Sequence, residues 1–193
     1  MILVGVCGGI AAYKSCELVR LLVKDGHEVQ VVQTPDSRRF VGPTTFAALS
    51  RRPVLTDGGA DVFPHLDASK AAELLCIAPL TATTMARIAH GEAANVLTAT
   101  ALAFTGPVVA APAMNPRMWE ADATRANVGV LEARGVELVG PGTGETAEGE
   151  LGVGRMAEPD EIAAAIVFLS SARASYVAGA AWSVDGGTVQ VII

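Results

Sequence analysis

Residues 2–34, ILVGVCGGIAAYKSCELVRLLVKDGHEVQVVQT, decide the fold class of this chain. They open with an unbroken apolar run that leads to Gly8 and Gly9, a pattern typical of a strand buried on both faces of a sheet. The segment that follows repeats leucines at helical spacing, and Gly26 predicts where that helix stops. The β-rich run EVQVVQT comes next, so the stretch predicts a parallel strand–helix–strand unit.

The same alternation continues along the chain. Further strands are predicted at residues 73–79, 107–113 and 136–141, and helices at 81–91 and 121–135. None of these strands alternates polar with apolar residues, so helices are expected on both faces of one doubly wound α/β sheet in a single domain. The glycine-rich segment 141–154 interrupts the pattern. It is predicted to be a functional loop, with a solvated surface excursion as the alternative.

The composition argues against several classes of protein. The chain has 193 residues, 51% of them hydrophobic and 18% charged, with a net charge of −6 and no long basic run. This balance argues against nucleic-acid and membrane partners, and neither a signal peptide nor a bilayer-spanning segment is expected. Cys7, Cys16 and Cys76 lack CxxC spacing, which favours a reduced cytoplasmic protein without a metal site.

Ligands of open α/β sheets bind at the carboxyl ends of the strands. Four loops follow predicted strands there: CGGIAAYKS (7–15), QTPDSRRF (33–40), APLTATTMA (78–86) and APAMNPRMW (111–119). The first could bring backbone N–H groups to an anion, although it has neither the GxGxxG nor the Walker pattern. Each loop alone could be an ordinary turn, but together they predict one pocket at one edge of the sheet.

Among the three histidines, His65 is the candidate for chemistry. His27 at a strand entry and His90 at a helix end have ordinary structural roles. His65 follows an irregular Gly/Asp/Pro stretch and precedes a predicted helix, and no metal-ligand partner stands at suitable spacing. It is expected to act as a base or a hydrogen-bond donor, with a structural role as the alternative.

Taken together, GGIAAYKS, His65 at its spacing before IAPLTATTMARIAHG, APAMNPRMW and GRMAEP resemble the homo-oligomeric flavin-containing cysteine decarboxylases, over residues 2–158. This family includes the phosphopantothenoylcysteine decarboxylases of coenzyme A biosynthesis and the peptidyl-cysteine decarboxylases. The resemblance implies a flavodoxin-like fold, a homotrimer or dodecamer, and FMN, or FAD as the other possibility, at the subunit interface. It also makes chemical sense, because oxidation of a cysteine thiol creates the electron sink that decarboxylation requires.

The resemblance further implies roles for individual residues. His65 matches the catalytic acid/base, and Asn115 matches the asparagine that binds the substrate carboxylate. Met114 and the glycine loop with Glu148 and Gly149 are expected at the substrate. The positions that match flavin contacts are Gly8, Gly9, Ile10, Thr34, Ser37, Thr81, Thr83, Thr84 and Ala113.

Two positions depart from the pattern of the coenzyme A enzymes. Glu148 stands where those enzymes carry a cysteine that serves to reduce the enethiol intermediate, and Thr83 replaces an asparagine. The first departure favours oxidative decarboxylation of a C-terminal peptidyl cysteine to an aminoenethiol, the precursor of aminovinyl-cysteine. The expected partner is then a Cys-terminated precursor peptide. Phosphopantothenoylcysteine decarboxylase is the alternative.

Residues 158–193 are expected to extend the decarboxylase domain, residues 1–157, by a helix and a strand at AAWSVDGG or TVQVII. The segment also resembles the end of short-chain dehydrogenases, but their glycine fingerprint and YxxxK pair are absent from the sequence. A binding protein that has lost catalysis is a further alternative. The presence of both His65 and Asn115 argues against it.

Overall fold

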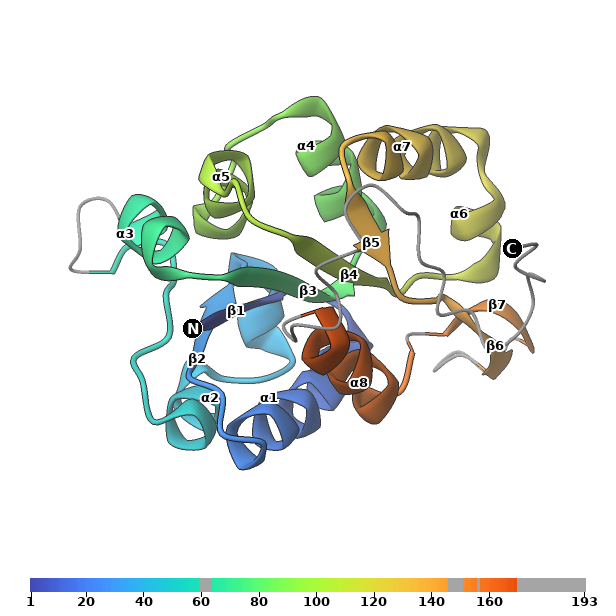
Figure 1. Ribbon diagram of the computed structural model, residues 1–193. Coiled ribbons are helices and arrows are strands. Elements are labelled where there is room, and N and C mark those ends of the chain that lie inside the picture. The colour runs from blue at the N-terminus through green and yellow to red at the C-terminus, as the bar shows by residue number, and fades with distance from the viewer. Residues whose placement is uncertain (60–63, 146–150, 156, 170–193) are drawn as a thin grey trace.

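A five-stranded parallel sheet forms the centre of the computed structural model, which describes residues 1–59, 64–145, 151–155 and 157–169 (Figure 1). Its strands are β1 (Ile2–Val6), β2 (Val29–Gln33), β3 (Leu74–Leu80), β4 (Val108–Pro112) and β5 (Val136–Leu138). The order β2-β1-β3-β4-β5, with every pair parallel, is the flavodoxin-like arrangement. The predicted fold class is confirmed.

Helices cover both faces of this sheet (Figure 1). One face carries α1 (Lys14–Lys24), α2 (Pro43–Ser50) and α8 (Pro159–Leu169). The other carries α3 (Pro64–Ala71), α4 (Ala82–His90), α5 (Val96–Ala103) and α7 (Asp122–Ala133), with the short α6 (Pro116–Glu120) beside α7. Short 3-10 helices η1 (Ile10–Tyr13) and η2 (Pro35–Arg39) follow β1 and β2.

The two helical layers explain why the strand sequences lack alternation. Every residue of β1 and β3 is buried. Val4 and Cys76 face the core under α1 and α8, whereas Leu3 and Leu75 face the core under α4 and α5. Because successive strand residues point to opposite faces, a strand with a core on each side is apolar throughout.

Glycines end the helices where the sequence predicts, but one helix start differs from expectation. Gly26 and Gly91 have φ of 91° and 73°, the left-handed conformation that stops a helix. Threonine is a common N-cap residue, so a hydroxyl of the TATT run would be expected to cap α4. Thr81 is the N-cap residue but makes no side-chain capping bond, and its hydroxyl instead donates to the hydroxyl of Thr84 at 3.3 Å.

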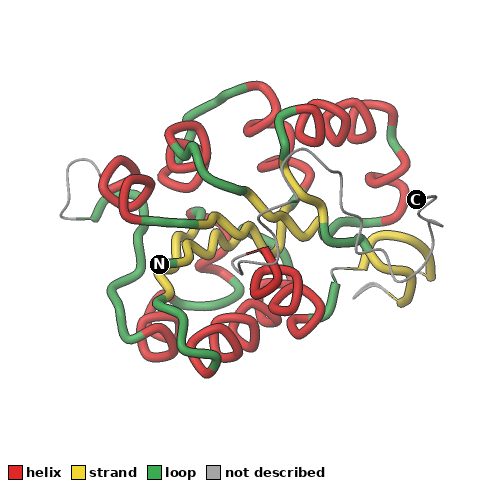
Figure 2. The backbone as a smooth tube through the Cα atoms, in the orientation of Figure 1, coloured by secondary structure: helices red, strands yellow, loops and turns green. Residues whose placement is uncertain are grey.

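The segment predicted to be a loop contains an antiparallel hairpin (Figure 2). β6 (Gly142–Glu145) pairs with β7 (Leu151–Arg155). The loop prediction is wrong for these residues. Glycine and glutamate have low strand propensity, so the residue types do not indicate the hairpin, which backbone hydrogen bonds form. Positions 148 and 149 lie outside the described residues.

The C-terminal extension begins as expected with a helix, α8, whose Ile162 and Ile166 are buried in the core cluster that also contains Leu18 of α1. The strand predicted near the end of the chain lies outside the described residues. Within the described part of the chain, no helix has the length and apolar character needed to cross a bilayer.

Candidate functional site

The loop after β1 packs tightly against its two neighbours at the carboxyl edge of the sheet. A Cβ atom on Gly8 would lie 2.9 Å from the backbone carbonyl carbon of Asp36, in the loop after β2. A Cβ atom on Gly9 would lie 3.5 Å from Cγ2 of Thr81, in the loop after β3. The absence of a side chain at position 8 therefore lets two loops of the predicted pocket touch.

Backbone hydrogen bonds join the same edge into one surface. The N–H of Thr34 donates to the carbonyl of Val6 at 3.1 Å, which ties the start of the second loop to β1. The N–H of Ala113 donates to the carbonyl of Leu80 at 3.0 Å, which ties the fourth loop to the third. The four loops predicted to form one pocket are therefore contiguous in the structure.

Several hydroxyls proposed for flavin contact are engaged in holding these loops. The Ser37 hydroxyl is fully buried, donates to the carbonyl of Thr34 at 2.8 Å and accepts from the amide of Gln33 at 3.2 Å. The Thr34 hydroxyl donates to the carbonyl of Val6 at 3.4 Å, and Thr84 is also buried. These side chains support the loop framework, and direct contact with a flavin stays a prediction for them.

Other predicted flavin-contacting positions are open to solvent. Ile10 is 53% exposed and Thr83 is exposed, while Gly8, Gly9 and Ala113 are half-buried. A ligand on this edge would therefore meet glycine backbone, an aliphatic side chain and the start of α4. These are suitable surroundings for a phosphate followed by an apolar ring.

Cys7 is the thiol next to this edge, and it is buried rather than presented to a ligand. Burial raises the pKa of its thiol, although hydrogen bonds with Thr84 and Thr81 act in the opposite direction. Because a thiolate is the reactive form, Cys7 is a packing residue and not a nucleophile.

Asn115 is held in a defined orientation at the end of β4. It is the N-cap of α6, and its side-chain oxygen accepts the backbone N–H of Arg117 at 2.9 Å. Met114 before it is half-buried and packs against the core. Trp119 after it is buried, with the guanidinium of Arg125 5.1 Å from its ring centroid. β7 of the hairpin contacts α6, so the hairpin lies next to the Asn115 loop.

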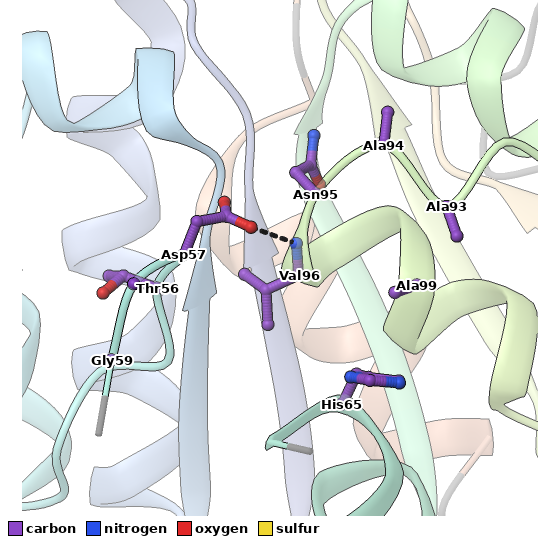
Figure 3. Close-up of a pocket in the computed structure, with 10 residues that line it drawn as sticks. Thr56, Asp57, Gly59, His65, Ala93, Ala94, Asn95, Val96 and Ala99 are labelled. Atoms are coloured by element: carbon purple, nitrogen blue, oxygen red, sulfur yellow. Dashed lines mark hydrogen bonds between the residues drawn. The ribbon is translucent and has the colours of Figure 1, made fainter. Parts of the chain in front are cut away.

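His65 lines a different part of the molecule. It is the second residue of α3 and borders a cavity of about 300 Å³ with the Thr56–Gly59 loop and the start of α5 (Figure 3). Asp57 accepts the backbone N–H of Val96 at 2.8 Å, and Asn95 caps α5 through the N–H of Thr98. Asp57 and Asn95 were missed from sequence; the turn TDGG and an Asn before an apolar run are the signals available for them.

A single chain does not bring His65 and Asn115 together. α3 lies at one end of the molecule, beside α5, and α6 lies at the opposite end next to β7 (Figure 1). Of the residues predicted at the substrate, the structure thus places Asn115 and Met114 at the carboxyl edge and His65 away from it. The described residues contain no group of three or more His, Cys, Asp or Glu that could hold a metal ion.

Comparison with known proteins establishes the family. The Flavoprotein family matches residues 1–171. The chain belongs to this family. One similar solved structure is a PPC decarboxylase with a cysteine-to-serine substitution, complexed with pantothenoylaminoethenethiol. It is 30% identical to this chain with a TM-score of 0.80, and the match covers 88% of this chain and 98% of the decarboxylase chain. The FMN-dependent cysteine decarboxylase SpaF is 30% identical with a TM-score of 0.75, covering 88% and 97%. The resemblance to flavin-containing cysteine decarboxylases is confirmed at this level.

Curated relatives of this flavoprotein are coenzyme A biosynthesis bifunctional proteins named CoaBC. That of Mycobacterium bovis is 47% identical over 163 residues, which are 83% of this chain and 39% of the relative. That of Vibrio vulnificus is 44% identical over 167 residues, which are 84% and 42%. The chain thus spans about two fifths of the length of these relatives.

The prediction of a peptidyl-cysteine decarboxylase that makes an aminoenethiol is therefore wrong. It rested on Glu148, whereas identities of 44–47% over most of the chain connect this flavoprotein with coenzyme A biosynthesis. SpaF is only 30% identical. One loop position carries less information than 47% identity over 163 aligned residues. The Cys-terminated precursor peptide stays an untested prediction as a partner.

Proposed function

We propose that this chain decarboxylates phosphopantothenoylcysteine in coenzyme A biosynthesis, with FMN as its cofactor. The observation that carries the proposal is the 47% identity to a coenzyme A biosynthesis protein over 83% of the chain. The match to a solved PPC decarboxylase covers 98% of that decarboxylase's chain, which supports the assignment of the decarboxylation step. The proposal concerns this step alone, because the bifunctional relatives are longer.

The carboxyl edge of the sheet fits FMN. Gly8 leaves no room for a side chain between the first two loops, so backbone N–H groups there are left to approach a phosphate. Gly9 and Thr81 border the next position, and exposed Ile10 offers an apolar surface to a ring. When bound, FMN supplies the two-electron acceptor that decarboxylation of a cysteine requires.

The chain's own residues supply binding and proton transfer. We assign His65 to take the proton of the substrate thiol, as a histidine can near neutral pH. Asn115 binds the substrate carboxylate through its amide, which the N–H of Arg117 holds in place. Loss of carbon dioxide breaks the bond between the carboxyl carbon and Cα, and Cα gains a proton, so substrate and final product have the same oxidation level.

The separation of α3 from α6 supports a site built from two copies of the chain (Figure 1). Exposed apolar side chains on the loops of the carboxyl edge support the same conclusion; they are Ile10, Tyr13, Phe40 and Met118. Burial of such side chains favours association by about 25 cal/mol per Å² of apolar surface. We therefore propose a homo-oligomer, with a trimer or dodecamer as the expected forms, in which His65 of one copy meets the flavin loops of another.

Mass spectrometry of the product tests the proposed function. Phosphopantothenoylcysteine incubated with the purified flavoprotein should lose about 44 mass units, the mass of carbon dioxide, and the His65→Asn variant should retain its flavin without turnover. A loss of about 46 mass units would mean that two hydrogens stay with the enzyme and that the cycle does not close. Turnover of Cys-terminated peptides without turnover of phosphopantothenoylcysteine would overturn the proposal.

A further inference from the structure

We propose that the ion pair between Lys14 and Glu158 positions the base of the β6–β7 hairpin relative to the loop that follows β1, called here the flavin loop. Lys14 Nζ lies 2.9 Å and 3.1 Å from the two carboxylate oxygens of Glu158. The Lys14 side chain is 17% exposed and that of Glu158 is 44% exposed. The pair is therefore partly shielded from water, and it joins residues 144 positions apart in the sequence.

Lys14 follows the proposed flavin loop in the sequence. It is the first residue of α1 and follows η1, which itself follows Gly9. Its helix is fixed by the core, since Leu18 and Leu22 are fully buried. The ammonium group thus extends from a rigid element that begins where the flavin loop ends.

Glu158 follows the hairpin in the sequence. It stands three residues after Arg155, the last residue of β7, and one before Pro159, which begins α8. Its backbone N–H donates to the carboxylate of Glu161 at 2.7 Å, an arrangement that fixes the start of α8. Ala157, the residue before Glu158, is buried. A contact at Glu158 therefore fixes the position of the chain three residues after the end of β7.

β7 contacts α6, the helix that Asn115 caps. The chain runs from this contact along β7 to Glu158, and Glu158 pairs with Lys14 at the start of α1. Lys14 and Glu158 act through this strand and not on reacting atoms, so they are positioning residues. We expect their loss to let β7 shift on α6 and to weaken substrate binding more than the chemical step.

A second ion pair on the same helix provides a matched control. Arg20 donates to Glu17 at 2.5 Å and 2.9 Å, with side chains 55% and 46% exposed, and this pair spans three residues within α1. Exposed pairs of this kind contribute little to stability. Arg20→Met and Glu17→Gln therefore remove one charge from α1 without touching the hairpin.

The experiment compares Lys14→Met, Glu158→Gln and the reversed pair Lys14→Glu/Glu158→Lys with the two control variants. Each single variant should raise the KM for phosphopantothenoylcysteine about fivefold to tenfold with kcat within about twofold, and the reversed pair should recover most of the loss. Hydrogen exchange of the Leu151–Arg155 amides should quicken in the single variants and not in the controls. Equal KM and exchange in test and control variants would overturn the inference, as would a reversed pair no better than the singles.

The inference rests on the proposed function, but the two can fail separately. If the wild-type protein does not decarboxylate phosphopantothenoylcysteine, the proposed function fails, and hydrogen exchange of β7 still decides whether the ion pair positions the hairpin. If the wild-type protein turns over this substrate and the Lys14 and Glu158 variants match the controls, the inference alone fails.

Discussion

Asp57 accepts the backbone N–H of Val96 at 2.8 Å and so joins the segment between α2 and α3 to the first turn of α5, 39 residues away. The other carboxylate oxygen of Asp57 is buried and has no hydrogen-bond partner among the described residues. Both residues border the cavity that His65 lines (Figure 3). The shape of this cavity therefore depends on a bond between two segments that are distant in sequence.

Replacement of Asp57 tests that dependence. Asp57→Ala should lower the free energy of unfolding by about 1–2 kcal/mol, because the N–H of Val96 loses its acceptor at a helix start. Asp57→Asn keeps an acceptor oxygen for the same N–H and should lose less. Urea denaturation measures both values. Equal stability of Asp57→Ala and the wild type would contradict the prediction.

Gly8 provides a second test, at the proposed flavin loop. Gly8→Ala places a methyl group 2.9 Å from the backbone of Asp36, so the first loop must move away from the second. We expect a loss of stability of about 1–3 kcal/mol and a marked loss of bound flavin. Flavin absorbance per mole of purified protein measures the second effect.

The matched control for Gly8→Ala is another glycine-to-alanine change. Gly129 lies within α7, and a Cβ atom there would meet no atom of the described residues within 4 Å. Because alanine is the better helix former, Gly129→Ala should stabilise the protein by about 0.5–1 kcal/mol and leave flavin content unchanged. A flavin loss equal to that of Gly8→Ala would show that the loop contact is not the cause.

The sheet could be predicted from sequence because burial on both faces leaves a plain signature. The strands predicted from the apolar stretches at residues 2–6 and 73–79 agree with β1 and β3 to within one residue at each end. The hairpin could not be predicted, because glycine-rich strands have neither an apolar run nor alternation. The hairpin forms through backbone pairing between β6 and β7, and the side-chain pattern of the two strands does not indicate this pairing.

The candidate site could be predicted only in part, for a similar reason. The loops at the carboxyl edge follow from the strand ends, and their contacts through Gly8 and Ala113 show that they are contiguous. That they form one ligand pocket stays a prediction. The Asp57–Val96 contact was missed because its two residues are 39 positions apart, and no local sequence pattern predicts such a contact. The distance between His65 and the carboxyl edge of the sheet depends on where α3 packs. The spacing of apolar residues in the sequence does not determine that position.

The buried thiol of Cys76 predicts a loss of stability at high pH. Burial in β3 raises its pKa from 9.0 to about 12. The folded state thus keeps the proton that the unfolded state releases, so the thiol's contribution is complete below pH 9 and falls by about 1.4 kcal/mol per pH unit from there to about 12. The stability difference between the wild type and Cys76→Ala should shrink over this range. A difference independent of pH, measured by urea denaturation, would contradict it.

Complementation between inactive variants tests whether His65 and Asn115 act from different copies. His65→Asn removes the proposed base, and Asn115→Asp repels the substrate carboxylate while keeping the acceptor for the N–H of Arg117. Each variant alone should be inactive. If each site of a closed ring combines His65 of one copy with Asn115 of the next, an equal mixture of both variants, refolded together, should regain about a quarter of wild-type decarboxylation. A site contained in one chain would give none. The control is an equal mixture of the double variant and the wild type, compared with the same total amount of wild-type protein alone. The mixture should have about a quarter of that activity if the site is shared, and about a half if each chain contains its own site.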